Sequence, residues 1–386
     1  MRRERLLDHV IAGLAHRGIP KHPLLLSALR LGVYQLLFMP GMPPHAAVHE
    51  TVSLIRNNRG FANALLRRAA GMVRSRGADA DRPREELWLS DHRALMLPKP
   101  LPPGQADRLA VLHSMPAWLA QRFCDQHGEQ GFGQIAQAAS TKPVIHLRCR
   151  GAAEELRARL QAEGVEVELS RDPRMLRWVG GVSPFATRSF LGGDFVAQDP
   201  TALAAASALP CRDGDQVIDL CAAPGTKTTF LAEQVGASGR VFACDPDAAR
   251  RERVVENVQR LQLGDVVEVV ADPAGLEPAD CVLADVPCSN TGVLGRRVEV
   301  RGRLTPETFN ELAALQQEIF TRAVTLTKPG GHLVYSTCSV DREENEAVVA
   351  AVMELHGDLE LLDQSLTLPE AGMRDGGFYA LLRRST

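Results

Sequence analysis

Two cysteines, Cys288 and Cys338, suggest the most specific chemistry in this sequence. Cys288 stands in DVPCSNTG, just after the run DCVLAD, and Cys338 stands in YSTCSV, at the end of the run HLVYST. A single cysteine in an apolar run more often packs as a small core residue. These two instead follow runs typical of strands, where a side chain lies at the rim of a ligand site. A thiolate there can add, as a nucleophile, to an electron-poor carbon of an unsaturated ring.

A short turn forms a second group of candidate residues. The turn CAAPGTK contains small residues, a proline and a glycine, so its backbone can lie close to a ligand. The helix expected after it offers free N–H groups to a polar part of that ligand. The sequence has no G-x-G-x-x-G motif, which argues against a nicotinamide or flavin cofactor. The candidate cofactor-binding residues of the turn are Cys221, Ala222, Ala223, Pro224, Gly225, Thr226 and Lys227.

Three aspartates, Asp245, Asp272 and Asp285, each end a strand-like run. Asp245 comes about twenty residues after the turn, where an acid commonly binds the ribose hydroxyls of a nucleoside cofactor. Asp272 is placed to accept a hydrogen bond from an adenine amino group. An isolated aspartate is more often a helix cap or a loop residue. Three of them at successive strand ends instead predict a nucleoside-containing cofactor.

The elements that must position these residues begin near Asp215. Strand-like and helix-like runs alternate from there onward, which predicts an α/β fold with a doubly wound, mostly parallel sheet. In such a sheet, ligands bind beyond the carboxyl ends of the strands, where the strand order reverses. The expected strands are 216–220, 240–245, 267–272, 280–285 and 332–338. We expect three helices, one that begins after Thr226, one over 248–260 and one over 306–326.

The rest of the chain divides into three further parts. Residues 1–76 show helical apolar spacing and predict an all-α domain. Residues 77–140 predict a loop to about Gln105 and then a helical segment. Residues 141–200 predict a small α+β module, and 201–386 hold the large sheet.

The charge is divided unevenly along the chain. The formal net charge is −3, yet the first 80 residues contain 12 Lys and Arg against 4 Asp and Glu. A basic N-terminal part favours contact with a polyanion such as RNA, although a solvated basic face has the same composition. The arginines that we expect to contact RNA phosphates are Arg67, Arg68, Arg74, Arg76, Arg296 and Arg297.

Composition excludes several other classes. Apolar residues make up 45% and charged residues 24%, as in folded globular proteins. No apolar run is long enough to span a membrane, and Asp8 and His9 interrupt any signal peptide, so we expect a cytoplasmic protein. Eight cysteines without a C-x-x-C pair predict neither disulfides nor structural zinc. His45 and His49 have a metal-ligand spacing but no third ligand, so we expect no metal and a packed His49.

Taken together, the motifs resemble those of the bacterial 16S ribosomal RNA cytosine-C5 methyltransferases that carry a NusB-like N-terminal domain. CAAPGTK, DVPCSNTG and YSTCSVDREEN match that family's motifs in order, and VAQDPTALAAA matches the segment before them. RLGVYQLLF, PPHAAVHETV and GFANALLRR resemble the second half of the NusB-like domain. The resemblance covers nearly the whole chain. It implies RNA-binding parts over 1–76 and 141–200 and an S-adenosylmethionine-dependent, Rossmann-like methyltransferase domain over 201–386.

The resemblance also implies a role for each cysteine. Carbon 5 of cytosine is a poor nucleophile, so a thiolate must first add to carbon 6. By resemblance, Cys338 is that nucleophile and Cys288 assists release of the methylated product. Asp285 is the candidate acid near ring nitrogen 3 that stabilises the adduct, and it also contacts the cofactor or the target base. Cytosine-C5 DNA methyltransferases instead take the nucleophile from the Pro-Cys motif, which here contains Cys288.

The sequence departs from the family pattern at three places. Thr226 replaces a usual glycine, which we expect to tighten the cofactor turn and weaken binding. The stretch Arg296–Pro306 lacks the usual Pro-Asp and Trp, so we expect its target contacts to differ from those of the family. The chain begins partway into the NusB-like domain, so we expect a shortened domain or a start codon placed too late.

Two alternative functions stay open. One is a non-catalytic RNA-binding or ribosome-assembly factor, and the other is a transfer RNA cytosine-C5 methyltransferase. The retained cysteines favour an enzyme, and the NusB-like part favours ribosomal RNA. We expect a monomer.

Overall fold

The computed structural model describes residues 2–77 and 83–386. The chain forms two compact units, Met1–Ser140 and Thr141–Thr386. Within the described residues, no helix combines the length and the apolar character needed to cross a membrane. Because the second unit contains both 141–200 and 201–386, the finer division into four parts stays a prediction.

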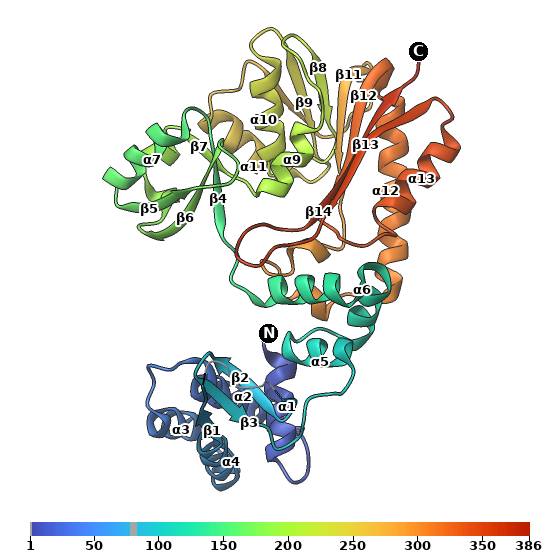
Figure 1. Ribbon diagram of the computed structural model, residues 1–386. Helices are drawn as coiled ribbons and strands as arrows, with labels where there is room; N and C mark the ends of the chain where they lie inside the picture. Colours follow the sequence, from blue (N-terminus) through green and yellow to red (C-terminus); the bar gives the residue numbers. More distant parts are fainter. Residues whose placement is uncertain (1, 78–82) are drawn as a thin grey trace. The chain divides into compact units, whose positions relative to one another are not determined.

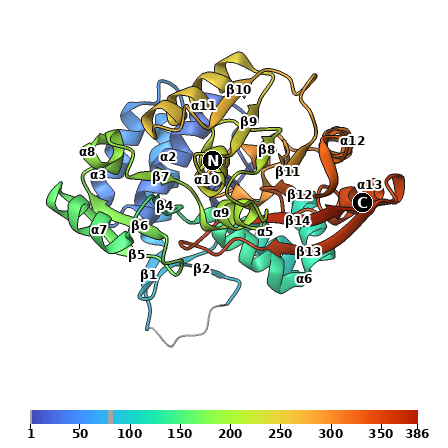
Figure 2. The same ribbon diagram turned by 90° about the horizontal axis from the view of Figure 1, so that it is seen from above.

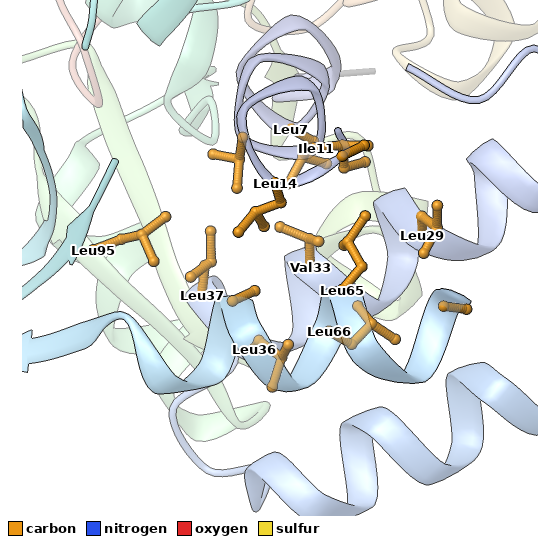
Figure 3. Close-up of a cluster of buried hydrophobic side chains, with 14 of the residues drawn as sticks. Leu7, Ile11, Leu14, Leu29, Val33, Leu36, Leu37, Leu65, Leu66 and Leu95 are labelled. Carbon is orange, nitrogen blue, oxygen red and sulfur yellow. The ribbon is translucent and has the colours of Figure 1, made fainter. Parts of the chain in front are cut away.

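Helices form the core of the first unit. Their bounds are α1 (Glu4–Leu14), α2 (Pro23–Phe38), α3 (Pro44–Ser53) and α4 (Arg59–Gly71). Both α2 and α3 begin with proline, which is tolerated there because the first turn of a helix needs no N–H partner. Leu14 of α1, Val33 of α2 and Leu65 of α4 lie in one buried apolar cluster (Figure 3). The predicted helical character of residues 1–76 is confirmed except at its end, where residues 73–75 form a strand.

The segment expected as a loop between residues 77 and 105 contains strands, so that prediction was wrong. A three-stranded antiparallel sheet has the order β1-β3-β2, with β1 (Val73–Ser75), β2 (Glu86–Ser90) and β3 (Arg93–Met96). Its Leu87 and Leu95 pack into the helical cluster. The segment's Pro, Arg and Asp content hid these distant apolar contacts. Residues 78–82 of the expected loop lie outside the described residues.

Two further helices complete the first unit. They are α5 (Gln105–Leu112) and α6 (Ala117–Ser140). Gly128 interrupts α6 with a φ of 70°. A second helical stretch then continues to Ser140. The sequence analysis expected a helical segment here without giving its bounds.

A seven-stranded sheet of order β10-β9-β8-β11-β12-β14-β13 forms the centre of the second unit (Figure 2). The strands are β8 (Gln216–Asp219), β9 (Arg240–Cys244), β10 (Val267–Val270), β11 (Ala279–Asp285), β12 (Thr327–Thr337), β13 (Leu359–Thr367) and β14 (Gly377–Arg384). β14 runs antiparallel to both of its neighbours, β12 and β13, and the other neighbouring strands pair in parallel. The chain order reverses between β8 and β11, which makes that point the expected ligand position. The predicted doubly wound, mostly parallel sheet is confirmed.

Helices cover both faces of this sheet (Figure 1). Those on one face are α9 (Pro200–Ser207), α10 (Thr226–Val235) and α11 (Ala248–Arg260), and those on the other are α12 (Pro306–Thr325) and α13 (Glu346–Leu355). Val217 of β8 packs in the apolar cluster under α9, α10 and α11, and the next residue, Ile218, packs in the cluster under α12 and α13. Burial on both faces explains why these strands have continuous apolar runs. Two 3-10 turns, η2 (Thr291–Val293) and η3 (Val300–Gly302), lie between β11 and α12.

A smaller antiparallel sheet of order β5-β6-β4-β7 precedes the large one in the chain. Its elements are β4 (Ile145–Cys149), α7 (Ala153–Ala162), β5 (Val165–Leu169), β6 (Met175–Gly181), η1 (Pro184–Ala186), α8 (Arg188–Leu191) and β7 (Phe195–Ala197). Leu147 packs with Leu160 of α7 on one face. On the other face, Met175 and Val196 join the core of the large sheet.

A buried ion pair also holds the small sheet against α10. Arg148 of β4 is 2% exposed, and its guanidinium pairs with Glu233 of α10. Arg148 also donates to the hydroxyl of Thr229 at 3.2 Å, and Arg150 pairs with Glu233 at 2.8 Å. Removing one partner of a buried pair leaves an uncompensated charge out of water.

We predict that Glu233→Ala lowers the free energy of unfolding by about 3 kcal/mol, because Arg148 stays buried without a carboxylate. The measurement is urea unfolding of the full chain. The control is Glu256→Ala on the exposed side of α11, which should stay within about 0.5 kcal/mol of the unaltered chain. Equal midpoints for the two variants would show that the ion pair does not hold the small sheet in place.

Candidate active site

The structure brings the two predicted cysteines together. Cys288 follows β11 and Cys338 follows β12, which are neighbouring parallel strands. Their Sγ atoms lie 3.1 Å apart. Asn290 accepts a hydrogen bond from the Cys338 thiol at 3.4 Å and donates one to the carbonyl of Cys288 at 2.7 Å. Asn290 has a φ of 61°, a backbone conformation that asparagine adopts more readily than most residues.

A buried carboxyl, Glu344, connects the two cysteine loops. Its Oε1 accepts from the backbone N–H of Ser289 at 2.7 Å and from Gln316 of α12 at 3.0 Å. Its Oε2 accepts from the hydroxyls of Ser289 and Ser339, the latter at 2.6 Å. Burial raises the pKa of Glu344 even though these hydrogen bonds oppose the shift. The sequence analysis quoted the motif that contains Glu344 but gave this residue no role.

Gly292 fixes the same loops through its backbone. Its N–H donates to the carbonyl of Cys338 at 2.9 Å, and its own carbonyl accepts from Gly376 at 2.9 Å. A Cβ at Gly292 would lie 2.5 Å from the Gly376 carbonyl oxygen and 2.8 Å from that of Cys338. Any other residue here would therefore push the two loops apart.

Beside Cys338 is a small cavity that also contains Lys227 and Asp285. Lys227 of α10 pairs with the Oδ2 of Asp285 at 2.5 Å, and Ser336 donates to the Oδ1 at 2.7 Å. Burial would lower the pKa of Lys227, but the charge and hydrogen bond of Asp285 raise it above its ordinary value. The cavity has a volume of about 110 Å³, near the roughly 150 Å³ that holds a benzene ring in an engineered cavity. One small planar ring is therefore of the right size to lie against the thiol.

The turn of residues 221–227 joins β8 to α10 at the switch point. Gly225, with a φ of 98°, precedes the first residue of α10. Thr226 begins that helix and is not among the residues with positive φ. Threonine therefore fits this backbone position, and the expected effect of Thr226 on cofactor binding stays a prediction. Ala222 donates its N–H to the carbonyl of Cys244 at 2.9 Å, which holds the turn beside β9.

Asp245 lies at the end of β9 and fits the ribose of a nucleoside. It is 1% exposed, and its Oδ1 accepts from the N–H of Asp247 at 3.1 Å. Arg250 lies 3.3 Å from the Oδ2, but no group in the described residues donates a well-aligned hydrogen bond to that oxygen. A buried carboxylate oxygen in this state is suited to accept from a ligand hydroxyl.

Asp272 and Asp219 complete the rim of strand ends. Asp272, after β10, is exposed and already pairs with Arg322 of α12, so an adenine amino group would share it. Asp219 ends β8, and burial raises its pKa to about 7. The hydroxyl of Thr228 donates to Asp219 at 2.7 Å. The sequence analysis did not single out Asp219, although it lies two residues before the cofactor turn in QVIDLC.

The arginines predicted to contact RNA differ in their exposure and in their ion pairs. Arg67, Arg68 and Arg74 are exposed in the first unit. Arg76 instead pairs with Glu86, which is mostly buried, so little of its charge is left for a phosphate.

Arg296 has a different role from the one expected. It pairs with Asp199 at 3.1 Å and with Asp375, and it donates to the carbonyl of Val144 at 2.8 Å. It thus bridges three segments and is not free for a phosphate. Arg297 is exposed, and its RNA contact stays a prediction.

The histidines were expected to bind no metal. The part of the chain that the structure describes contains no group of three or more His, Cys, Asp or Glu that could hold a metal ion. The expectation that His49 is packed was wrong, because its side chain is 81% exposed.

Comparison with known proteins identifies the family. The family models that match are "16S rRNA methyltransferase RsmB/F" over residues 206–380 and "NusB family" over residues 1–71. A Bacillus subtilis protein named "Probable ribosomal RNA small subunit methyltransferase B" is 30% identical over 394 residues, covering 97% of this chain and 83% of that protein. The chain belongs to the RsmB/F family of 16S ribosomal RNA methyltransferases.

Further relatives agree with this assignment. "Ribosomal RNA small subunit methyltransferase B" of Yersinia pseudotuberculosis is 33% identical over 378 residues, covering 91% of this chain and 80% of that protein. The crystal structure of a "Methyltransferase Homolog Protein" from Pyrococcus horikoshii matches with a TM-score of 0.63 and 25% identity, over 74% of this chain and all of that one. The RsmB/F chain is therefore an S-adenosylmethionine-dependent methyltransferase with a NusB domain.

We predict that Asp245→Ala weakens S-adenosylmethionine binding to this RsmB/F protein about 10- to 100-fold, since a hydrogen bond to a charged group contributes roughly 1.5 to 3 kcal/mol. Titration calorimetry measures the affinity. Asp280→Ala is the control, because Asp280 lies near the amino end of β11, whereas Asp245 lies where the carboxyl ends of the strands meet. Equal affinities of the two variants would contradict a ribose contact at Asp245.

Proposed function

We propose that this chain transfers a methyl group from S-adenosylmethionine to carbon 5 of a cytosine in 16S ribosomal RNA, through a covalent adduct with Cys338. The observation that carries the proposal is the position of Cys338 in the wall of a ring-sized cavity, together with Lys227 and Asp285. Cys288 does not line this cavity, although its Sγ lies 3.1 Å from that of Cys338. The choice of substrate RNA is supported by the relatives named as small-subunit methyltransferases.

Cys338 begins the reaction by adding to carbon 6 of the cytosine. The new carbon–sulfur bond makes an enamine of the ring, and carbon 5 becomes nucleophilic. S-adenosylmethionine, when bound, supplies an electrophilic methyl group to that carbon. The hydrogen of carbon 5 then leaves to a base, the carbon–sulfur bond breaks, and the double bond re-forms.

Lys227 and Asp285 stabilise the charge that develops on the ring. Their contact at 2.5 Å makes a single unit of one cation and one anion at the cavity wall. A second N–H of the Lys227 ammonium, which the Asp285 carboxylate orients, can donate a hydrogen bond to ring nitrogen 3 while Cys338 adds. Lys227, expected from the sequence to bind the cofactor, thus acts on the target base in this proposal.

Cys288 supports the release step. The hydrogen bond with Cys338 and burial raise the pKa of Cys288 well above its ordinary value, so its thiol keeps its proton. A protonated thiol 3.1 Å from the departing sulfur of Cys338 can stabilise that sulfur as a leaving group.

The RNA is expected to extend beyond the cavity. Arg67, Arg68 and Arg74 in the first unit and Arg297 in the second are exposed and suited to phosphate contacts. We also propose that the protein acts as a monomer in the bacterial cytoplasm.

We predict that the two cysteine variants fail at different steps. Cys288→Ala should accumulate a covalent complex with methylated RNA, because addition and methyl transfer remain possible while release is impaired. Cys338→Ala should form no such complex, and its methyl transfer should fall to background. The measurement is a denaturing gel of each variant after incubation with 16S ribosomal RNA and S-adenosylmethionine.

Cys281→Ala is the matched control, because Cys281 is a buried cysteine of β11 that does not reach the cavity. It should turn over without a trapped band. A trapped band with Cys338→Ala and none with Cys288→Ala would reverse the two roles. No band with any variant, together with no methyl transfer by the unaltered chain, would favour a non-catalytic RNA-binding factor.

A further inference from the structure

A groove of about 540 Å³ adjoins the catalytic cavity. It is lined by the loop of residues 170–174 between β5 and β6, and by His146, Pro200, Glu370, Met373 and Arg374. Pro200 directly follows Asp199, and Arg374 directly precedes Asp375, and both aspartates line the catalytic cavity. Consecutive residues lie about 3.8 Å apart, so the groove and the cavity share a thin wall at two places. The groove therefore lies next to the place proposed for the target base.

The groove carries an excess of positive charge. Arg171, Arg174 and Arg374 line it, against two acids, Asp172 and Glu370. The side chains of the three arginines are 74%, 49% and 47% exposed, so their guanidinium groups can be reached from solvent.

The ion pairs in the groove leave two of the arginines exchangeable. Glu370 alone faces both Arg171, at 3.3 Å, and Arg374, at 3.7 Å. Exposed pairs of this kind contribute about 1 kcal/mol or less, so a phosphate can replace the carboxylate. Arg174 is instead held by both oxygens of Asp172, at 3.0 and 2.7 Å, so its charge is already paired and it is not exchangeable.

We propose that this groove binds the phosphate backbone of the RNA strand directly beside the target cytosine. Arg171 and Arg374 exchange Glu370 for phosphate oxygens, which the planar guanidinium binds with two parallel hydrogen bonds. The inference rests on the proposed function, since it takes the cavity beside Cys338 as the place of the cytosine.

Three variants test the groove by the sign of their effects. The double variant Arg171→Gln/Arg374→Gln removes the exchangeable charges, and Glu370→Gln removes the acid that competes with the phosphate. Arg240→Gln is the control, because Arg240 is 54% exposed and pairs with Glu268 at 3.3 Å. It is the first residue of β9, so it lies at the amino ends of the strands and away from the site. Each is titrated with a fluorescein-labelled transcript of 16S ribosomal RNA over a range of sodium chloride concentrations.

The double variant should bind the transcript severalfold more weakly, and the slope of log affinity against log salt should shrink by about 0.7 for each lost phosphate contact with a single strand. Its KM for RNA should rise while kcat stays unchanged, because backbone contacts stabilise the bound substrate and the transition state equally. Glu370→Gln should bind more tightly than the unaltered chain, and Arg240→Gln should match it.

Two results would overturn the inference. One is a double variant that matches Arg240→Gln in affinity and salt slope, and the other is a Glu370→Gln variant that weakens binding, which would give the ion pairs a structural role only. If either result occurs while Cys288→Ala still traps RNA, the proposed RNA binding by the groove is wrong and the proposed function stands. If Cys288→Ala traps no RNA and the unaltered chain transfers no methyl group, the proposed function falls and this inference with it.

Discussion

The buried carboxyl of Glu344 holds together the two loops on which the chemistry depends. Ser289 and Ser339, each one residue after a cysteine, both donate to it, and Gln316 adds a third element, α12. Taking a carboxyl out of water is costly unless its oxygens are hydrogen-bonded, and here both are. Together with the Gly292 N–H, which donates to the carbonyl of Cys338, this arrangement keeps the thiols of Cys288 and Cys338 in contact.

The rest of the site follows from the sheet. Parallel strands end at one edge, so Asp219, Asp245 and Asp285 reach the same rim from three different strands. The switch point between β8 and β11 leaves room there for a ligand. Lys227 comes from the helix that follows β8 and meets Asp285 across this point. A nucleoside cofactor and a target ring can therefore lie on the two sides of one short turn.

The sequence predicts the large sheet well because strands that are buried on both faces have continuous apolar runs, and several of these runs end in an aspartate. The helix expected over 248–260 has those bounds in the structure. Other features depend on contacts that no local pattern reports. Arg296 finds its carboxylates 97 and 79 residues away, at Asp199 and Asp375. The strands β2 and β3 form against a helical core, which their composition does not reveal.

Release of tritium from ribosomal RNA labelled at carbon 5 of cytidine is the measurement that tests the central claim most directly. A methyl group can replace the hydrogen of carbon 5 only if that carbon–hydrogen bond breaks. The account predicts one tritium released for each methyl group transferred by the unaltered chain, and none by Cys338→Ala. Methyl transfer without release of tritium would place the methyl group on another atom and contradict the role given to Cys338.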